Sequence, residues 1–203
     1  PDLVEWVGGR RRLTKVMRAR RAFRLRQERS VEAFRARAAK LARIEANRGE
    51  HEYPPGSNRQ KYGRFWKEDG VAWCALFALW VLFHAGARIT VKAAWTYDYV
   101  PYLVADARRG RGGWTTVALS AVQPGDLVCT TYRGGDPMGA HVEVAVDEWN
   151  ASAGVVPTVG GNTSKQGSGG SDDNGGGVWP RTRTRSEIVE VVRWVGPMRG
   201  EAD

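Results

Sequence analysis

The chain is poor in cysteine and has no long apolar run, and both features limit the classes of protein to which it can belong. Cys74 and Cys129 are the only cysteines among 203 residues, too few for a disulfide framework. Neither has partners at zinc-ligand spacing, so we expect no structural metal and no cofactor. The longest apolar run, residues 71–85, contains His84 and is shorter than a membrane span. It therefore predicts a buried core helix and no transmembrane segment.

Acidic residues are scarce in the first quarter of the chain. Residues 1–50 carry 15 Lys and Arg against 6 Asp and Glu, a net charge of +9, whereas residues 51–203 carry 16 of each and are neutral. This asymmetry predicts a basic arm followed by a neutral domain. Three roles fit such an arm: packing of a solvated helix on its own domain or a neighbour, attachment to an anionic polymer or membrane surface, and contact with nucleic-acid phosphates.

The arm has the pattern of a helix. Residues 10–48 contain no proline and no glycine and are rich in Arg, Ala, Leu and Glu, which favour helices. Ser30 is suited to cap a new helix, so one long helix and two shorter ones both fit the pattern. The turn-forming residues 49–57 end the helical stretch, which divides the chain into an arm, 1–50, and a domain, 51–203. An apolar stripe lines one face of the expected helix: Val31, Phe34, Ala38, Leu41 and Ile44.

The second region predicts helices first and antiparallel strands afterwards, which is an α+β layer fold. Cys74–Ala85 has the composition of a buried helix that stops at Gly86. The glycine-rich residues 133–139 predict a hairpin turn, and Pro157 predicts that its strand lies at a sheet edge. Residues 165–177 are rich in Gly, Ser and Asp and predict a mobile loop. The expected strands are residues 127–132, 141–149, 155–159 and 188–195.

A cysteine at a helix start and a histidine on a strand form the strongest chemical signal. At the first turn of its helix, Cys74 faces unpaired backbone N–H groups and the positive end of the helix dipole, which stabilise a thiolate nucleophile. His141 begins an alternating stretch and is suited to take the thiol proton. The alternative is a buried structural thiol and a core histidine. We assign structural roles to Cys129, His51 and His84.

Several segments, taken in order, point to one family. The nucleophile region is Asp69-Gly70-Val71-Ala72-Trp73-Cys74-Ala75-Leu76-Phe77, and the other segments are 55–63, 123–128, 158–164, 177–179 and 181–185. Together they resemble the CHAP domains, which are cysteine- and histidine-dependent amidohydrolases and peptidases. The resemblance covers about residues 53–196. Its specificity lies in the ordered set rather than in any single segment.

The resemblance implies a papain-like α+β fold and a catalytic cysteine and histidine. Cys74 is then the nucleophile, and His141 takes its proton and later protonates the leaving amine. The family often shows an acidic residue, a glycine and an asparagine after the histidine strand, and here Gly160 stands where the acid is expected. Asn162 is the first choice to orient His141, because its amide oxygen accepts a hydrogen bond. Glu143 is the second choice, because it shares a strand face with His141.

The oxyanion that forms during acyl transfer needs hydrogen-bond donors. The backbone N–H of Cys74 is one candidate, since it lies at a helix start. Tyr62 is a second candidate, because it belongs to the matched segment before the nucleophile; the alternative for Tyr62 is a packed aromatic side chain. Some family members bind calcium before the cysteine, but residues 67–70 offer too few acidic ligands, so we expect no metal there.

The resemblance implies a phage-encoded peptidoglycan hydrolase that cleaves an amide bond of the peptide stem or cross-bridge. It would act as an endolysin, passing from the host cytoplasm to the cell wall, or as a hydrolase of the virion tail. The arm would then contact an anionic cell-wall polymer, a virion protein or nucleic acid. A structural or assembly protein of the virion with an inactive domain is the main alternative, and Gly160 favours it. A cysteine protease that acts on proteins is the third reading.

Overall fold

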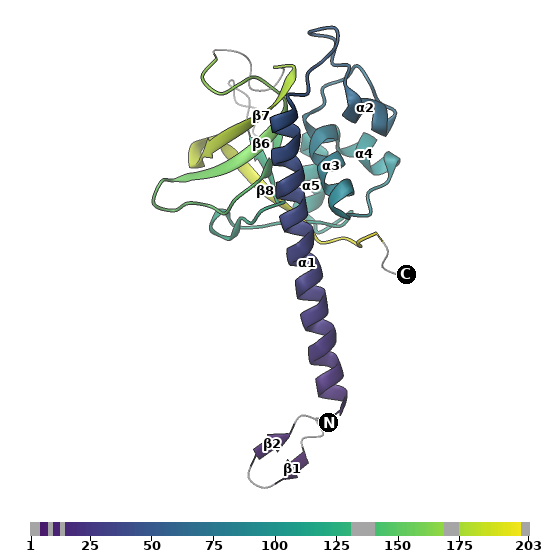
Figure 1. Ribbon diagram of the computed structural model, residues 1–203, viewed down its shortest axis with the longest axis vertical. Coiled ribbons are helices and arrows are strands. Elements are labelled where there is room, and N and C mark those ends of the chain that lie inside the picture. The colour runs from purple at the N-terminus through teal and green to yellow at the C-terminus, as the bar shows by residue number, and fades with distance from the viewer. Residues whose placement is uncertain (1–4, 8–9, 13–14, 131–140, 169–174, 200–203) are drawn as a thin grey trace. The chain divides into compact units, whose positions relative to one another are not determined.

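A computed structural model describes residues 5–7, 10–12, 15–130, 141–168 and 175–199. The chain forms two compact units, Pro1–Phe34 and Arg35–Asp203. In the first unit, strands β1 (Glu5–Val7) and β2 (Arg10–Arg12) pair antiparallel. Helix α1 (Lys15–Arg48) begins in this unit and ends in the second (Figure 1).

The arm contains one continuous helix. The 34 residues of α1 run through Ser30 without a break, so the interpretation of Ser30 as the cap of a second helix is wrong. No proline or glycine interrupts this range, and each residue therefore adds a backbone hydrogen bond to the growing helix. The expected helical stretch begins too early, because Arg10–Arg12 form a strand. All described α1 side chains before Ser30 are exposed or half-buried.

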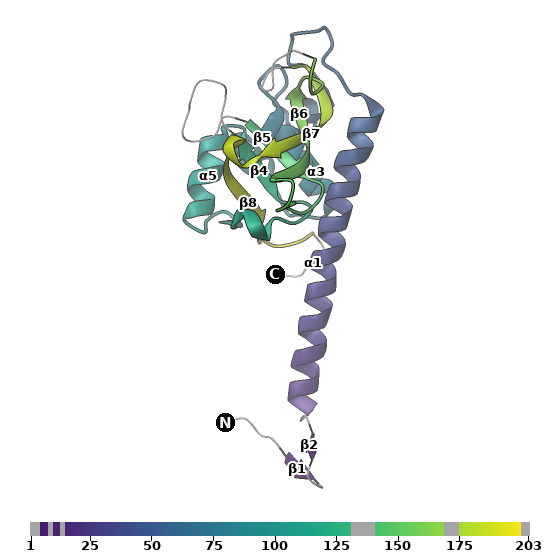
Figure 2. The same ribbon diagram turned by 90° about the vertical axis from the view of Figure 1, so that its left-hand side faces the viewer.

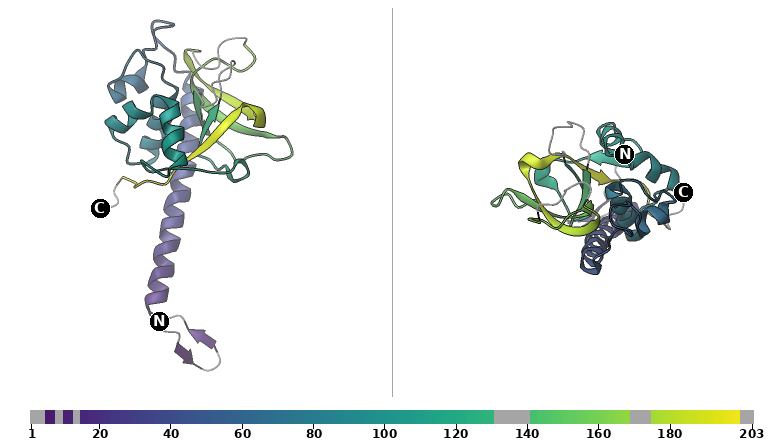
Figure 3. Two further views of the ribbon diagram at one scale, coloured as in Figure 1. Left: turned by 180° about the vertical axis from the view of Figure 1, so that it is seen from behind. Right: turned by 90° about the horizontal axis from the view of Figure 1, so that it is seen from above.

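The second unit is built around a six-stranded antiparallel sheet with the order β3-β8-β4-β5-β6-β7. Helices α2 to α5 gather on one side of it (Figures 1 and 3). This arrangement confirms the α+β fold class. The strands are β3 (Trp114–Thr116), β4 (Leu127–Thr130), β5 (His141–Ala145), β6 (Val155–Thr163), β7 (Gly177–Thr184) and β8 (Ile188–Trp194). The helices are α2 (Lys61–Trp66), α3 (Cys74–Ala85), α4 (Val91–Tyr97) and α5 (Val100–Arg108), with 3₁₀ turns η1 (Leu119–Ala121) and η2 (Arg185–Glu187).

Strands β4 and β5 pair antiparallel, with Leu127 opposite Val144 and Thr130 opposite His141. Their antiparallel pairing is as the sequence predicts, although β5 ends at Ala145, before the expected limit. The predicted turn, residues 133–139, lies outside the described residues. Most of the predicted loop over 165–177 also lies outside them or forms a short turn, and Gly177 already belongs to β7.

Pro157 does not mark a sheet edge, so that expectation is wrong. Strand β6 lies between β5 and β7. The Pro157 carbonyl accepts a hydrogen bond from the Val146 N–H at 3.0 Å, and N and O of one residue point to the same side of an antiparallel strand. The proline nitrogen therefore faces Val146, and the bond that a residue 157 N–H would donate to the Val146 carbonyl is missing. That carbonyl instead accepts a hydrogen bond from Arg43 Nη2 at 2.6 Å, so an interior strand tolerates the proline.

Helix α3 is the centre of the core and is apolar on nearly all sides, with nine of its residues buried. It packs against β5 and β6 (Figure 2). The close approach depends on Gly161, where a Cβ would lie 2.6 Å from Phe77 Cβ and 2.8 Å from the Trp73 ring. The helix ends at Gly86, whose φ of 128° is open to glycine but strained for other residues.

The last turns of α1 belong to the second compact unit. Ala38 and Ala42 are fully buried, and the buried Glu45 carboxylate accepts a 2.7 Å hydrogen bond from the Tyr62 hydroxyl and pairs with Lys61. The boundary between the two units therefore lies within α1, after Phe34, and not near residue 50, where α1 has ended. None of the helices in the described ranges is long and apolar enough to cross a membrane.

Candidate active site

Cys74 is the first residue of α3 and retains 4 % of its surface. Trp73 precedes it as the N-cap and provides no side-chain hydrogen bond to the helix start. The Trp73 indole is instead held by Glu52, which accepts from Nε1 at 2.9 Å. The first backbone N–H groups of α3 therefore lack a capping side chain from Trp73, and the thiol lies where the helix dipole favours negative charge.

His141 is the first residue of β5 and is 1 % exposed. Its Nε2 lies 3.3 Å from Glu143 Oε1, which leaves Nδ1 as the nitrogen available to the thiol. Burial alone would lower the pKa of His141, but the neighbouring Cys74 and Glu143 more than offset this and raise the pKa to about 9. Within the described residues, neither ring nitrogen has a partner with full hydrogen-bond alignment, and such bonds often tighten only when substrate binds.

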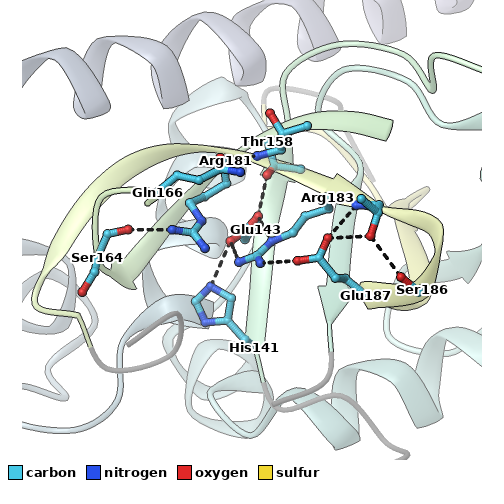
Figure 4. Close-up of polar contacts among 11 residues, drawn as sticks. His141, Glu143, Thr158, Ser164, Gln166, Arg181, Arg183, Ser186 and Glu187 are labelled. Atoms are coloured by element: carbon cyan, nitrogen blue, oxygen red, sulfur yellow. Dashed lines mark hydrogen bonds and ion pairs between the residues drawn. The ribbon is translucent and has the colours of Figure 1, made fainter. Parts of the chain in front are cut away.

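The carboxylate of Glu143, which lies beside His141, is held by three hydrogen bonds. Its Oε2 accepts hydrogen bonds from Thr158 Oγ1 at 2.5 Å and from Arg183 Nε at 3.0 Å, and Oε1 accepts from Arg183 Nη2 at 2.5 Å. These side chains point toward one another in Figure 4. Burial would raise the pKa of Glu143, but the hydrogen bonds and charges of His141 and Arg183 lower it well below its usual range. The carboxylate is therefore ionised beside the imidazole.

Gly160 explains how Glu143 fits. It lies directly opposite Glu143 across the β5–β6 ladder. A Cβ at Gly160 would lie 2.9 Å from Oε1 and 3.0 Å from Cγ of Glu143. The Glu143 side chain thus occupies the space over the glycine, and the carboxylate that the resemblance places on β6 is supplied from β5.

The two candidates for orienting His141 lie in different surroundings. Asn162 is fully buried in β6, where the pairing register shifts, and has a left-handed φ of 56°. Asparagine tolerates this conformation better than most residues. The group measured beside His141 Nε2 is the Glu143 carboxylate. Glu143, the second choice from the sequence, is therefore the candidate whose carboxylate lies next to the imidazole.

Tyr62 is not placed to stabilise an oxyanion. Its hydroxyl donates to Glu45 and its backbone N–H donates to Gln60 Oε1 at 2.6 Å. The ring is buried and stacks on Trp73 with 5.6 Å between ring centroids. Both donors are committed, so the assignment of Tyr62 to the oxyanion site is corrected to the packed-aromatic alternative. The Cys74 backbone N–H remains the candidate donor.

The second cysteine and the two other histidines lie at positions that fit structural roles. Cys129 is completely buried in β4, and burial raises the pKa of its thiol. His84 Nδ1 lies 2.9 Å from the Trp80 carbonyl one turn earlier in α3. The His51 ring packs against Trp179, with 5.5 Å between centroids. No group of three or more His, Cys, Asp and Glu side chains in the described ranges is arranged to hold a metal ion.

Sequence reasoning missed Thr158 and Arg183. Neither residue type by itself signals an interaction with a carboxylate on another strand. The alternation Arg181-Thr182-Arg183-Thr184 is the one available signal, because it places two arginines on one face of a strand. Arginine on an inward face needs an anionic partner, and Glu143 was the only candidate-site carboxylate.

Replacing Gly160 by alanine tests the placement of Glu143. The new Cβ would overlap the carboxylate, so Glu143 has to move and its hold on His141 weakens. We expect iodoacetamide to alkylate Cys74 about ten- to a hundredfold more slowly, as expected for a catalytic group displaced by about 1 Å. Gly154→Ala is the control: it adds the same methyl group at a position where the Cβ meets no atom within 4 Å, and its φ of 68° makes alanine unfavourable there, so any loss of stability is not specific to the site. Equal alkylation rates in both variants would contradict the arrangement.

Comparisons of this chain with family models, with curated proteins and with solved structures found no match.

Proposed function

We propose that the chain is a cysteine-dependent amide hydrolase with a papain-like arrangement of its site, acting on bacterial peptidoglycan. The observation that carries the reaction type is that Cys74, at the start of α3, and Glu143, on β5, both interact with the His141 side chain. A thiol at a helix start, an imidazole with a raised pKa and a buried carboxylate behind it form a nucleophile, a base and an orienting group. The substrate class comes from the resemblance of residues 53–196 to CHAP domains.

The reaction proceeds in two halves. The Cys74 thiolate attacks the carbonyl carbon of the amide, and the oxygen of the tetrahedral intermediate faces the backbone N–H of Cys74. The His141 imidazolium gives its proton to the nitrogen of the leaving amine, and the C–N bond breaks to leave a thioester. Neutral His141 then takes a proton from water, hydroxide attacks the thioester carbon, and the C–S bond breaks to release the acid and regenerate the thiolate.

The positive charge of the first unit supports the proposal that the target is anionic. This charge would draw the protein to cell-wall polymers that carry phosphate or carboxylate groups. This supports the proposal of a phage-encoded hydrolase that reaches the wall as an endolysin or in a virion tail. The structural virion role rested on the missing acid at Gly160, and the Glu143 carboxylate over that glycine removes this support.

Digestion of purified peptidoglycan tests the proposal. The wild-type protein is expected to release soluble peptides, the Cys74→Ala variant to release none, and Cys129→Ala to retain activity because that thiol lies buried in β4. Mass spectrometry of the new termini distinguishes an amidase from an endopeptidase. Absence of release from walls of several bacteria by folded wild-type protein would refute the substrate class and favour the structural role.

A further inference from the structure

Glu143 is held by a cation from a strand that it does not pair with. Glu143 lies on β5 and Arg183 on β7, with β6 between them, so their backbones are about 10 Å apart. Two parallel hydrogen bonds nevertheless join the guanidinium to the carboxylate, from Nε to Oε2 at 3.0 Å and from Nη2 to Oε1 at 2.5 Å. The Glu143 side chain lies over Gly160, which has no Cβ to obstruct it, and Arg183, opposite Val156 on β6, reaches the carboxylate diagonally.

The guanidinium is itself fixed on its other side. Arg183 Nη1 donates to Glu187 Oε1 at 3.0 Å. Glu187 Oε2 accepts from the backbone N–H and the hydroxyl of Thr184, both at 2.7 Å, and so closes a capping box at η2. Arg183 is buried, whereas Glu187 is at the surface. The guanidinium is thus held between the carboxylates of Glu143 and Glu187, and Figure 4 shows these contacts.

The signs of the buried charges show what Arg183 contributes. When the thiol has ionised, the groups around the imidazole are the Cys74 thiolate from α3, the His141 imidazolium and Glu143 carboxylate from β5, and the Arg183 guanidinium from β7. These four charges cancel. Without Arg183 the buried set carries one net negative charge, and a low-dielectric interior disfavours that state. The remaining charged groups near Arg183 are Glu187 on η2 and Arg181, which lies two residues earlier on β7.

We propose that Arg183 is a positioning residue of this site, which aims the Glu143 carboxylate at His141 Nε2 and balances the charge of the ionised thiol. The inference rests on the proposed function. Arg183 hydrogen-bonds to Glu143 and Glu187, and it acts on the site through the Glu143 carboxylate and through its own charge. Its two effects are separable: the pair of hydrogen bonds, or fork, sets the direction of the Glu143 carboxylate, and the positive charge offsets the negative charge of the ionised thiol.

The test measures alkylation of Cys74 by iodoacetamide as a function of pH, with peptide mapping to separate Cys74 from Cys129. In Arg183→Gln we expect alkylation at pH 7 to be about tenfold slower and the midpoint of the pH profile to rise by about one unit. Arg183→Lys keeps the charge and loses the fork, so its midpoint should stay near the wild-type value while the rate falls. A wild-type rate and midpoint in either variant would overturn the proposal.

A second arginine provides the matched control. Arg193 on β8 forms the same fork with buried Asp126, from Nε at 2.8 Å and Nη2 at 2.7 Å. Asp126 precedes the start of β4, whereas His141 pairs with Thr130 at the opposite end of that strand. Arg193→Gln therefore removes an equivalent buried ion pair away from the site. It should lower thermal stability as Arg183→Gln does and leave the Cys74 profile unchanged; an equal shift in both variants would mean that Arg183 is merely structural.

Alkylation requires no peptidoglycan, so the two proposals fail in different ways. If wild-type Cys74 reacts fast and Arg183 variants shift its profile while no cell wall is digested, the positioning role holds and the substrate class is wrong. If wild-type Cys74 reacts as slowly as Cys129, the activated thiol is absent and both proposals fail. If Arg183→Gln does not fold, as judged by circular dichroism, Arg183→Lys provides the deciding measurement.

Discussion

Glutamine in place of Glu143 is expected to remove most of the hydrolytic activity and several kcal/mol of stability. The amide keeps the shape of the side chain but cannot balance either buried cation, His141 or Arg183. Breaking a buried ion pair by neutralising one partner costs about 3–5 kcal/mol, and loss of oriented acid–base catalysis lowers turnover by about 10²–10⁴-fold. Urea denaturation measures the first effect, and release of peptides from peptidoglycan or alkylation of Cys74 measures the second.

The stability difference between wild type and Glu143→Gln depends on pH with a defined sign. The pKa of Glu143 is lowered in the folded protein, so its contribution is complete above its unfolded pKa of about 4.3 and is lost as the pH falls through the lower folded value. The pKa of His141 is raised to about 9. Its contribution is complete below the unfolded value of about 6.5 and is lost as the pH rises through 9.

Two observations check this pH dependence. Wild-type stability should decline between about pH 6.5 and pH 9, and the variant should decline less, since its imidazole has lost the carboxylate that raises the pKa. The same His141 titration sets an alkaline limb of hydrolysis near pH 9, because the neutral imidazole no longer protonates the leaving amine. If Glu143→Gln were as stable as wild type at neutral pH and its Cys74 alkylation were unchanged, Glu143 would stabilise neither His141 nor Arg183.

Removal of residues 1–50 is expected to unfold the domain, whereas a chain that begins at Ser30 should fold. The longer deletion removes the buried methyl groups of Ala38, Ala39 and Ala42, worth about 2 kcal/mol. It also removes Glu45 and leaves the buried Tyr62 hydroxyl without its acceptor, which costs about 1–3 kcal/mol. Together this is a large part of the 5–15 kcal/mol by which a typical domain is stable.

Ser30 is a suitable start because a serine is a good helix cap, and the described side chains before it in α1 are not buried. Circular dichroism and thermal melting of the two truncated proteins measure the difference. Glu45→Gln in the full chain is a finer variant, which retains the methyl groups and weakens the bonds to Lys61 and Tyr62. The boundary at Arg35 would be wrong if residues 51–203 melted at the temperature of the full chain.

Local sequence patterns were sufficient to predict several elements of the fold. An unbroken apolar run that ends at glycine predicted α3 with both of its limits, since a helix start and a glycine stop are local events. Alternation around a glycine-rich turn predicted the pairing of β4 and β5. Pro157 gave a wrong prediction and Ser30 left two alternatives open, because a propensity is only a preference of a residue type and the surrounding ladder or helix decides the outcome.

The sequence by itself determined where the two proposed reacting groups lie, Cys74 at a helix start and His141 at a strand start, because each position follows from local chain signals. Only the tertiary structure decided which carboxylate lies beside the histidine. The space above Gly160 is filled by Glu143 from the adjacent strand, and Arg183 reaches the same carboxylate from two strands away. Such contacts depend on strand order and register, which join residues 40 positions apart in the chain, and no local pattern specifies them.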